Sequence, residues 1–362
     1  MAVAGAGAFG RNHLRVYREL EASGLPVVLA GAVEPDAARA AETAAKYSIP
    51  VFASVEELLS ADLRLDAASV AVPTVHHHAV ALTLLDAGLD LLVEKPLAAT
   101  LAEADELLAL VERKSRILQP GHLERFNPAV LAVQPKLRRP MFFEAHRLSI
   151  FTPRSLDVDV VLDLMIHDLD IVLTFANSPV REVRAVGLPI LSPKVDIANV
   201  RVEFESGCVA NFTASRVSTE RVRKLRFFEP RQYVSIDYAR RDLLVIRLDG
   251  SVPPEIAAAL EGGQIDPAML AQLGAAAAGG GPNPGLSIAK PPISPGEPLR
   301  LEIESFLESV RTRQSPRVTS RQGRDALALA LEIQASMASH AVRAGLQDFF
   351  EPPAVGPALH NS

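Results

Sequence analysis

Residues 1–10 read MAVAGAGAFG, a short apolar run that leads directly into the pattern G-x-G-x-x-G at Gly5, Gly7 and Gly10. A helical pattern follows over residues 11–20. Between a strand and a helix, the first glycine allows a tight turn and the second lets the backbone approach a pyrophosphate. The third lets the helix pack closely on the strand, and the helix N-terminus offers free N–H groups to the phosphate. The stretch therefore predicts a dinucleotide-binding domain.

An acidic residue downstream completes this motif. Glu34 ends a second apolar run, at the interval of about 20 residues where a carboxylate accepts hydrogen bonds from both ribose hydroxyls of an adenosine. Such a carboxylate repels a 2′-phosphate, so we expect NAD to be preferred over NADP. Arg39 lies nearby and leaves dual cofactor use open; the alternative for Glu34 is a solvated acid before a helix that Asp36 caps. We expect Ala8 and Phe9 to line the cofactor together with the glycines.

The composition is that of a globular protein with two domains. The chain has 362 residues, of which 48% are hydrophobic and 22% charged. A net charge of −6 disfavours nonspecific binding to nucleic acid or to an anionic membrane. The single cysteine, Cys208, excludes an intrachain disulfide and fits a reducing compartment. No apolar run approaches the roughly 18 residues that span a bilayer, and no basic region precedes the first apolar stretch, so we expect a cytoplasmic protein.

The order of the apolar runs predicts an α/β protein in two parts. Through residues 1–120, strand-like runs alternate with helical patterns, which is typical of a Rossmann domain with a parallel sheet and right-handed crossovers. Over residues 121–350, strands follow one another with short turns, so we expect an α+β domain with a largely antiparallel, open sheet that packs helices on one face. The Gly- and Ala-rich part of residues 253–295 predicts a flexible insertion.

Polar residues follow the fourth predicted strand. Residues 73–78 read PTVHHH, and the carboxyl ends of strands in such sheets line the cofactor crevice. We therefore expect Pro73, Thr74 and His77 to line the dinucleotide. Consecutive histidines on a turn point in different directions, and no cluster with ligand spacing accompanies them, so no metal site is predicted. A helix that Thr74 caps, with surface histidines, is the alternative.

The fifth predicted strand ends in Glu94-Lys95-Pro96. A lysine at the crevice, close to a cationic nicotinamide, has its ammonium form disfavoured by like charge and by partial burial. It then accepts a proton, or donates a hydrogen bond to a substrate oxygen. We expect Lys95 to be catalytic and to line the cofactor with Glu94 and Pro96. Solvated charges at a strand end are the alternative.

A third group lies in the helix predicted over residues 159–175. Asp163 and His167 are four residues apart, so they share one face of a helix, whereas Asp168 points elsewhere. A carboxylate beside an imidazole fixes the tautomer of the ring and raises its basicity. The pair suits removal of a hydroxyl proton, or binding of a sugar hydroxyl. A charged helix edge with a core histidine is the alternative.

The segment that follows the first domain also carries candidate residues. Residues 121–128 read GHLERFNP, and we expect them to line the cleft between the domains. Arg125 or Asn127 would then touch the substrate or the nicotinamide amide. A cap at a hinge is the alternative.

Together these stretches resemble the Gfo/Idh/MocA family of NAD(P)-dependent oxidoreductases. The matching pieces, in the order of the family, are residues 5–10, 73–77, 94–96 and 163–167. The resemblance covers about residues 1–250 and 296–345. It implies a Rossmann domain and a mostly antiparallel domain whose open sheet mediates oligomers. It also implies Lys95 and His167 as catalytic residues with Asp163 beside them, and a sugar or polyol whose secondary alcohol gives a hydride to the nicotinamide.

Within the family, residues 121–128 and 162–170 look most like the sugar-nucleotide branch. This implies oxidation at C3 of a UDP-linked N-acetylhexosamine by a homodimer or homotetramer. A dehydrogenase of a free sugar or of inositol stays open. So does a non-catalytic NAD-binding regulator, although its expected mark is loss of the Lys or of the Asp/His pair. The sequence does not decide whether Lys95 or His167 is the base.

Overall fold

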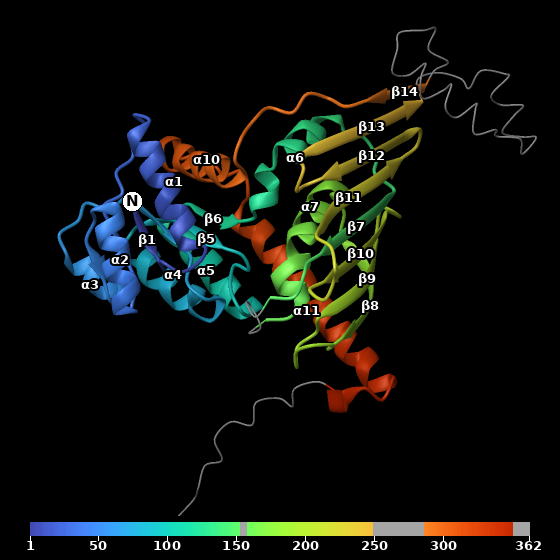
Figure 1. Cartoon of the computed structure of the whole chain (residues 1–362), viewed down its shortest axis with the longest axis horizontal. Coiled ribbons are helices and arrows are strands. Elements are labelled where there is room, and N and C mark those ends of the chain that lie inside the picture. Colours follow the sequence, from blue (N-terminus) through green and yellow to red (C-terminus); the bar gives the residue numbers. More distant parts are fainter. Residues whose placement is uncertain (153–157, 249–285, 350–362) are drawn as a thin grey trace, which may run out of the picture. The chain divides into compact units, whose positions relative to one another are not determined.

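The computed structural model describes residues 1–152, 158–248 and 286–349. The chain divides into two compact units (Figure 1). Unit 1 comprises Met1–Phe126 and Gly296–Leu331, and unit 2 comprises the described parts of Asn127–Pro295 and Glu332–Ser362. No helix among the described residues is both long enough and apolar enough to cross a membrane.

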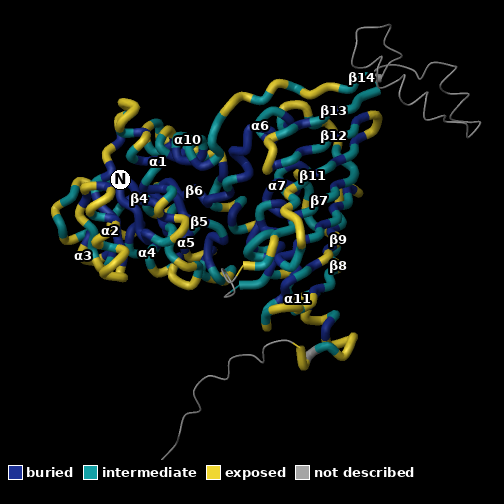
Figure 2. Tube along the Cα trace, in the orientation of Figure 1, coloured by how far each residue is buried: buried dark blue, intermediate teal, exposed yellow. Residues whose placement is uncertain are grey.

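Unit 1 contains a six-stranded sheet in the order β3-β2-β1-β4-β5-β6, in which every neighbouring pair is parallel. Its strands are β1 (Ala2–Ala4), β2 (Gly31–Val33), β3 (Val51–Phe52), β4 (Ala67–Val70), β5 (Asp90–Glu94) and β6 (Leu118–Gly121). Its helices are α1 (Gly10–Ala22), α2 (Ala37–Tyr47), α3 (Val55–Ser60), α4 (His77–Asp86), α5 (Leu101–Lys114) and α10 (Pro298–Thr312). Strands β1, β4 and β5 are buried throughout, as expected for a parallel sheet with helices on both faces (Figure 2). This confirms the predicted Rossmann fold.

Helix starts in unit 1 follow local sequence signals. The Asp36 side chain accepts a hydrogen bond from the Arg39 N–H at 2.8 Å, so Asp36 is the N-cap of α2. Thr100 and Glu103 form a reciprocal capping box at the start of α5. Both devices satisfy N–H groups that the first helical turn leaves open.

The C-terminal segment differs from the expected division into residues 1–120 and 121–350. Leu299, Ile303 and Phe306 of α10 are buried in the core of unit 1 together with α1 and β1. The amphipathic period of α10 predicts a helix, but not the core that its apolar face joins. Helix α11 (Ser320–Arg343) begins in unit 1 and ends in unit 2.

Unit 2 contains an eight-stranded sheet in the order β14-β13-β12-β11-β7-β10-β9-β8. Among the residues that the structure describes, all its neighbouring strands are antiparallel except the pair β7 and β10. Its strands are β7 (Phe142–Leu148), β8 (Val180–Leu188), β9 (Ile197–Phe204), β10 (Val209–Ser215), β11 (Val222–Glu229), β12 (Gln232–Asp237), β13 (Asp242–Leu248) and β14 (Leu286–Ala289). The predicted, largely antiparallel sheet is thus confirmed. Most of the predicted insertion at residues 253–295 lies outside the described residues.

One face of this sheet is covered and the other is open. Buried and half-buried residues alternate along β7, β11 and β12. On the covered face, the Phe175 ring of α7 (Ile166–Ala176) lies edge-on against Phe227, with ring centroids 6.0 Å apart. Arg147, also on this face, makes a bidentate ion pair with Asp168 of α7, at 2.7 and 3.1 Å. These contacts attach α7 to the middle of the sheet.

A buried carboxylate organises a loop of unit 2. Asp196 accepts hydrogen bonds from three successive backbone N–H groups, residues 190–192, and from the Ser192 hydroxyl. Arg216 donates to the same carboxylate at 2.7 Å and to the Val158 carbonyl at 3.0 Å. Burial alone raises the pKa of Asp196, but these donors outweigh it and hold the pKa well below its usual range.

Replacing Asp196 with alanine is expected to lower the free energy of unfolding of unit 2 by about 3–5 kcal/mol, because Arg216 stays buried without its carboxylate. Since the folded-state pKa is depressed, this stabilisation is present above the unfolded value near 3.9 and is lost as the pH falls toward the folded value. Urea unfolding followed by circular dichroism, at neutral pH and near pH 3, measures both effects. Glu203→Ala, which breaks the exposed pair with Arg201, is the control and should cost less than about 1 kcal/mol.

Candidate functional site

The glycine motif forms a turn at the carboxyl end of β1. Gly5 has a φ of +92°, and a Cβ there would lie 2.7 Å from the Ala71 carbonyl oxygen. A Cβ on Gly10 would overlap the carbonyl oxygen of Gly5. A Cβ on Gly7, by contrast, would meet nothing within 4 Å, so the backbone there faces open space. Gly5 and Gly10 therefore close the turn, and Gly7 leaves room for a ligand. This arrangement fits a pyrophosphate at the start of α1.

Glu34 is held at the end of β2, next to this turn. Its Oε2 accepts a hydrogen bond from the Ala6 N–H at 3.1 Å, and its Oε1 accepts from the Asp36 N–H and from Arg39, each at 3.0 Å. Burial raises the pKa of Glu34, but Arg39 and the two N–H donors outweigh it and lower the pKa below its ordinary value. A fixed, ionised carboxylate at this place fits the ribose of NAD.

Replacing Glu34 with serine is expected to weaken the preference for NAD over NADP by about 10²-fold in kcat/KM. Each hydrogen bond lost between the carboxylate and the ribose weakens the binding free energy of NAD by roughly 1.5–3 kcal/mol. Without Glu34, Arg39 becomes free to pair with a 2′-phosphate. Initial rates with both cofactors measure the ratio. Arg39→Ala in the Glu34→Ser background is the control, and it should remove the gain with NADP but not the loss with NAD.

The Glu94-Lys95-Pro96 segment follows the carboxyl end of β5. Glu94 and Pro96 are buried, while Lys95 is half-buried. The Lys95–Pro96 peptide bond is cis. Because β1 and β5 are parallel members of one sheet, Lys95 and the glycine turn lie at the same edge of that sheet.

His77 lies inside unit 1, at the start of α4. Its side chain is 1% exposed. Its Nδ1 lies 2.8 Å from the Pro96 carbonyl oxygen and its Nε2 lies 2.9 Å from the Val72 carbonyl oxygen. Burial lowers the pKa of His77, and the two carbonyls and Glu94 act in the opposite direction. The ring therefore contacts the backbone on both sides.

The neighbours of His77 have other surroundings. Pro73 is exposed, and Thr74 begins the short 3₁₀ turn η1 (Thr74–His76), which has no side-chain cap. His78 pairs with Glu106 of α5 at 2.9 Å. In the described parts of the chain, no group of three or more His, Cys, Asp or Glu side chains is arranged to hold a metal ion.

His13 is not among the residues that the sequence motifs predict. This residue is fully buried on the first turn of α1, with its Nε2 2.9 Å from Glu94 Oε1 and its Nδ1 3.1 Å from the Ser69 hydroxyl. The Tyr17 hydroxyl lies 2.8 Å from the same Ser69 oxygen. A histidine three residues after the last glycine of the motif, on the inward face of the helix, was the available signal.

Asp163 and His167 of unit 2 lie on consecutive elements. Asp163 belongs to η4 (Val161–Met165), a π-helical turn, and His167 is the second residue of α7; both are half-buried. Asp159 precedes the turn, and its carboxylate accepts from the N–H groups of Val161 and Leu162 and from Gln334 of α11. Short π-helical turns occur frequently at functional sites. The predicted helix over residues 159–175 thus begins with a wider turn that the sequence does not indicate.

Arg125 and Asn127 are buried, and Asn127 has a structural role. Its Oδ1 accepts from the Ala129 N–H at 3.1 Å, so it is the N-cap of α6 (Pro128–Val133). Its amide donates to the Tyr238 carbonyl at 3.2 Å. This matches the alternative considered from the sequence, a cap; contact of either residue with substrate stays a prediction.

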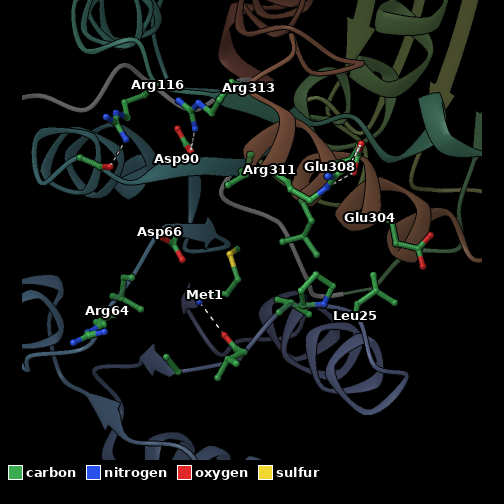
Figure 3. Close-up of a pocket in the computed structure, with 18 residues that line it drawn as sticks. Met1, Leu25, Arg64, Asp66, Asp90, Arg116, Glu304, Glu308, Arg311 and Arg313 are labelled. Carbon is green, nitrogen blue, oxygen red and sulfur yellow. Dashed lines mark hydrogen bonds and ion pairs between the residues drawn. The ribbon is translucent and has the colours of Figure 1, made fainter.

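A cavity of about 920 Å³ lies at the other edge of the sheet in unit 1 (Figure 3). Met1 and Asp90 line it, and they stand at the amino ends of β1 and β5. Gly5 and Lys95 follow the carboxyl ends of the same two strands. The cavity is therefore separate from the dinucleotide site that the glycine motif indicates.

Comparison with known families matches both parts of the chain. A family described as "Oxidoreductase family, NAD-binding Rossmann fold" matches residues 1–122. The "GFO/IDH/MocA C-terminal domain" matches residues 130–231.

Named relatives extend this result. A UDP-N-acetylglucosamine 3-dehydrogenase from Acidithiobacillus ferrooxidans is 33% identical over 336 residues, 92% of this chain and 96% of that protein. Its solved structure gives a TM-score of 0.79 at 32% identity, over 96% of this chain and 98% of that one. An inositol 2-dehydrogenase from Leifsonia xyli subsp. xyli is 32% identical over 189 residues, 50% of this chain and 54% of that protein. A levoglucosan dehydrogenase in complex with NADH, at 17% identity and a TM-score of 0.75 over 93% and 96% of the two chains, shows the shared fold.

Proposed function

The chain belongs to the Gfo/Idh/MocA family of NAD-binding oxidoreductases, and from that premise we propose that it oxidises C3 of a UDP-linked N-acetylhexosamine. The observation that carries this proposal is the likeness to the Acidithiobacillus enzyme, which extends over both units and nearly the whole of that protein. The inositol dehydrogenases match about half of the chain, so a free polyol is the second candidate.

We assign binding of the cofactor and removal of the proton to different residues of the chain. The turn with Gly5, Gly7 and Gly10 holds the pyrophosphate, and Glu34 holds the adenosine ribose. NAD, when bound, supplies the hydride acceptor. Oxidation of the alcohol to a ketone also releases the hydroxyl proton, and the protein must take it. We assign this proton to the amine of Lys95 or to the imidazole of His167.

We assign Asp163 to His167, as the group that orients the imidazole and stabilises its protonated form. Its place on the π-helical turn just before α7 supports this assignment. A carboxylate near an imidazole stabilises the ring once it has taken a proton.

We further propose that the reaction takes place in the cytoplasm, because a chain with one cysteine fits a reducing compartment.

A substrate panel tests the proposal. Purified protein with NAD is incubated with UDP-N-acetylglucosamine, UDP-N-acetylgalactosamine, UDP-glucose, free N-acetylglucosamine and myo-inositol, and the reduced nicotinamide is followed by absorbance. Turnover of a UDP-N-acetylhexosamine, with the product identified as the 3-keto sugar by mass spectrometry after isotope-labelled reduction, supports it. Turnover of inositol alone contradicts it, and tight NAD binding with no turnover of any compound points to a regulator.

We also propose that the open face of the sheet in unit 2 joins copies of the chain. Phe142, Phe228 and Tyr233 form an aromatic row there, with neighbouring ring centroids 5.4 and 5.1 Å apart. Arg226 and Glu144 form an ion pair beside it, at 3.5 Å. Aromatic residues with arginine nearby are typical of the centre of a protein interface.

Replacing Phe228 with lysine is expected to shift the oligomer toward monomer, with at least about 30-fold weaker self-association. An aromatic residue at the centre of an interface contributes roughly 2 kcal/mol or more. Sedimentation velocity over a dilution series measures the change. Arg240→Glu, which alters the charge of an exposed turn between β12 and β13, is the control and should leave the distribution as it is.

A further inference from the structure

We propose that His13 and His77 are positioning residues, which hold the amine of Lys95 in place by anchoring the residues on either side of it. This inference rests on the proposed catalytic role of Lys95. All the residues concerned belong to unit 1.

His77 anchors the residue that follows Lys95. Its ring bridges the carbonyl of Pro96 and the carbonyl of Val72, which lies just beyond β4. Carbonyl oxygens only accept hydrogen bonds, so a ring that satisfies both must donate from both nitrogens. Burial has the largest effect and lowers the pKa of this ring, as does the Lys95 ammonium, and the two carbonyls and Glu94 offset this only in part. The neutral ring still donates to one of the two carbonyls, so the attachment persists in either state.

His13 anchors the residue that precedes Lys95. A carboxylate accepts only, so His13 Nε2 must donate to Glu94 at 2.9 Å. The same carboxylate also lies close to Gly121 of β6, where an added Cβ would come within 2.9 Å of its Cδ and Oε1. The carboxylate is therefore fixed between α1 and the neighbouring strand.

A chain of donors fixes the His13 ring in turn. With Nε2 donating to Glu94, Nδ1 of a neutral ring accepts from the Ser69 hydroxyl, and the Ser69 oxygen accepts from the Tyr17 hydroxyl. Burial raises the pKa of Tyr17, which keeps its hydroxyl protonated as this order requires. His13 and Ser69 each have a partner on both sides, so the ring has one orientation that satisfies the whole chain.

These two anchors matter because the lysine side chain is long and flexible. Four methylene groups separate the amine from the backbone, and the amine must meet a hydroxyl proton within hydrogen-bond distance. A displacement of about 1 Å at a reacting group costs up to roughly 10²-fold in rate. Loss of either anchor should therefore act on the chemical step more than on cofactor binding.

Matched substitutions test the inference. His13→Leu and His77→Leu remove the donors, His13→Gln keeps a donor and an acceptor, and His78→Leu removes only the outer contact with Glu106. We expect kcat to fall about 10- to 100-fold in the first two variants, with recovery in His13→Gln and no change in His78→Leu. NADH affinity, measured by its own fluorescence in a chain that has no tryptophan, should change by less than about threefold.

The double variants with Lys95→Ala show whether the histidines act through the lysine. In that background neither histidine substitution should lower kcat by more than about twofold, since the group they position is gone. Hydrogen exchange of the peptide over residues 92–99 needs no substrate, and it should become faster in His13→Leu and His77→Leu while α5 keeps its protection.

Two kinetic results would overturn the inference: wild-type kcat in both leucine variants, or the same loss of kcat with and without Lys95. Unchanged exchange over residues 92–99 would also overturn it. A different result, wild-type kcat in Lys95→Ala alone, rejects the proposed role of Lys95 instead, so the two failures are distinguishable.

Discussion

Replacing Lys95 with alanine is expected to lower kcat by about 10²–10⁴-fold, the range for removal of a general acid or base. Lys95 is half-buried and follows the carboxyl end of β5, directly after the buried Glu94. It carries no part of the pyrophosphate turn, so NADH affinity should stay within about threefold of wild type. Steady-state kinetics with the sugar found in the substrate panel, together with an NADH titration, measures both quantities.

The matching control is Lys114→Ala. Lys114 ends α5 and pairs with the exposed Asp86 at 2.6 Å. It leads into the amino end of β6, at the edge of the parallel sheet opposite to Lys95. It should leave kcat within about twofold, because exposed ion pairs contribute little. Turnover by Lys95→Ala at the wild-type rate would remove this lysine from the mechanism.

Replacing His167 with alanine is expected to lower kcat by a similar factor, about 10²–10⁴-fold. A base must be unprotonated to act, so the rate rises with pH through the pKa of that base. This rise is the acidic limb of the pH profile of kcat. The variant that lacks the base loses the acidic limb, whereas the other variant keeps it. A pH profile of kcat for Lys95→Ala and His167→Ala therefore identifies the base, which the sequence leaves open.

His340→Ala is the control for the second variant, since this half-exposed histidine lies near the end of α11 in unit 2. It should keep both the rate and the shape of the profile. Acidic limbs that are identical in wild type, Lys95→Ala and His167→Ala would show that neither residue takes the proton.

The sequence predicts the main elements well because their signals are local. Strand β5 ends at Glu94 as predicted, and Asp36 caps α2 as expected. Periods of two and of about 3.6 residues, with caps at the helix starts, are properties of neighbours in the chain. They therefore require no knowledge of the tertiary structure.

The features that the sequence does not predict depend on distant partners. Strand β3 has two residues, too few for a visible period, and β14 lies inside the stretch 253–295 that the composition predicts as a flexible insertion. The parallel pairing of β7 with β10 depends on the order of strands in the sheet, and no local sequence pattern indicates that order. The π-helical turn at Asp163 follows Asp159, whose carboxylate accepts from the first N–H groups of the turn and from Gln334, 175 residues away.

The candidate site shows the same division. The glycine turn and Glu34 were found from spacing, because a fixed motif encodes them. The place of His77 beneath Pro96 and the bond from His13 to Glu94 join residues 19 and 81 positions apart. Such contacts carry no periodic signal in one sequence.

The placement of α10 in the core of unit 1 bears on how such enzymes can be recombined. The dinucleotide-binding part is not one uninterrupted stretch, since Leu299 and Phe306 close a core that begins at the first strand. A graft that exchanged only residues 1–126 would pack the new segment against an α10 from a different protein. Chimaeras made to swap cofactor preference between relatives must therefore exchange two separate blocks, residues 1–126 and 296–331.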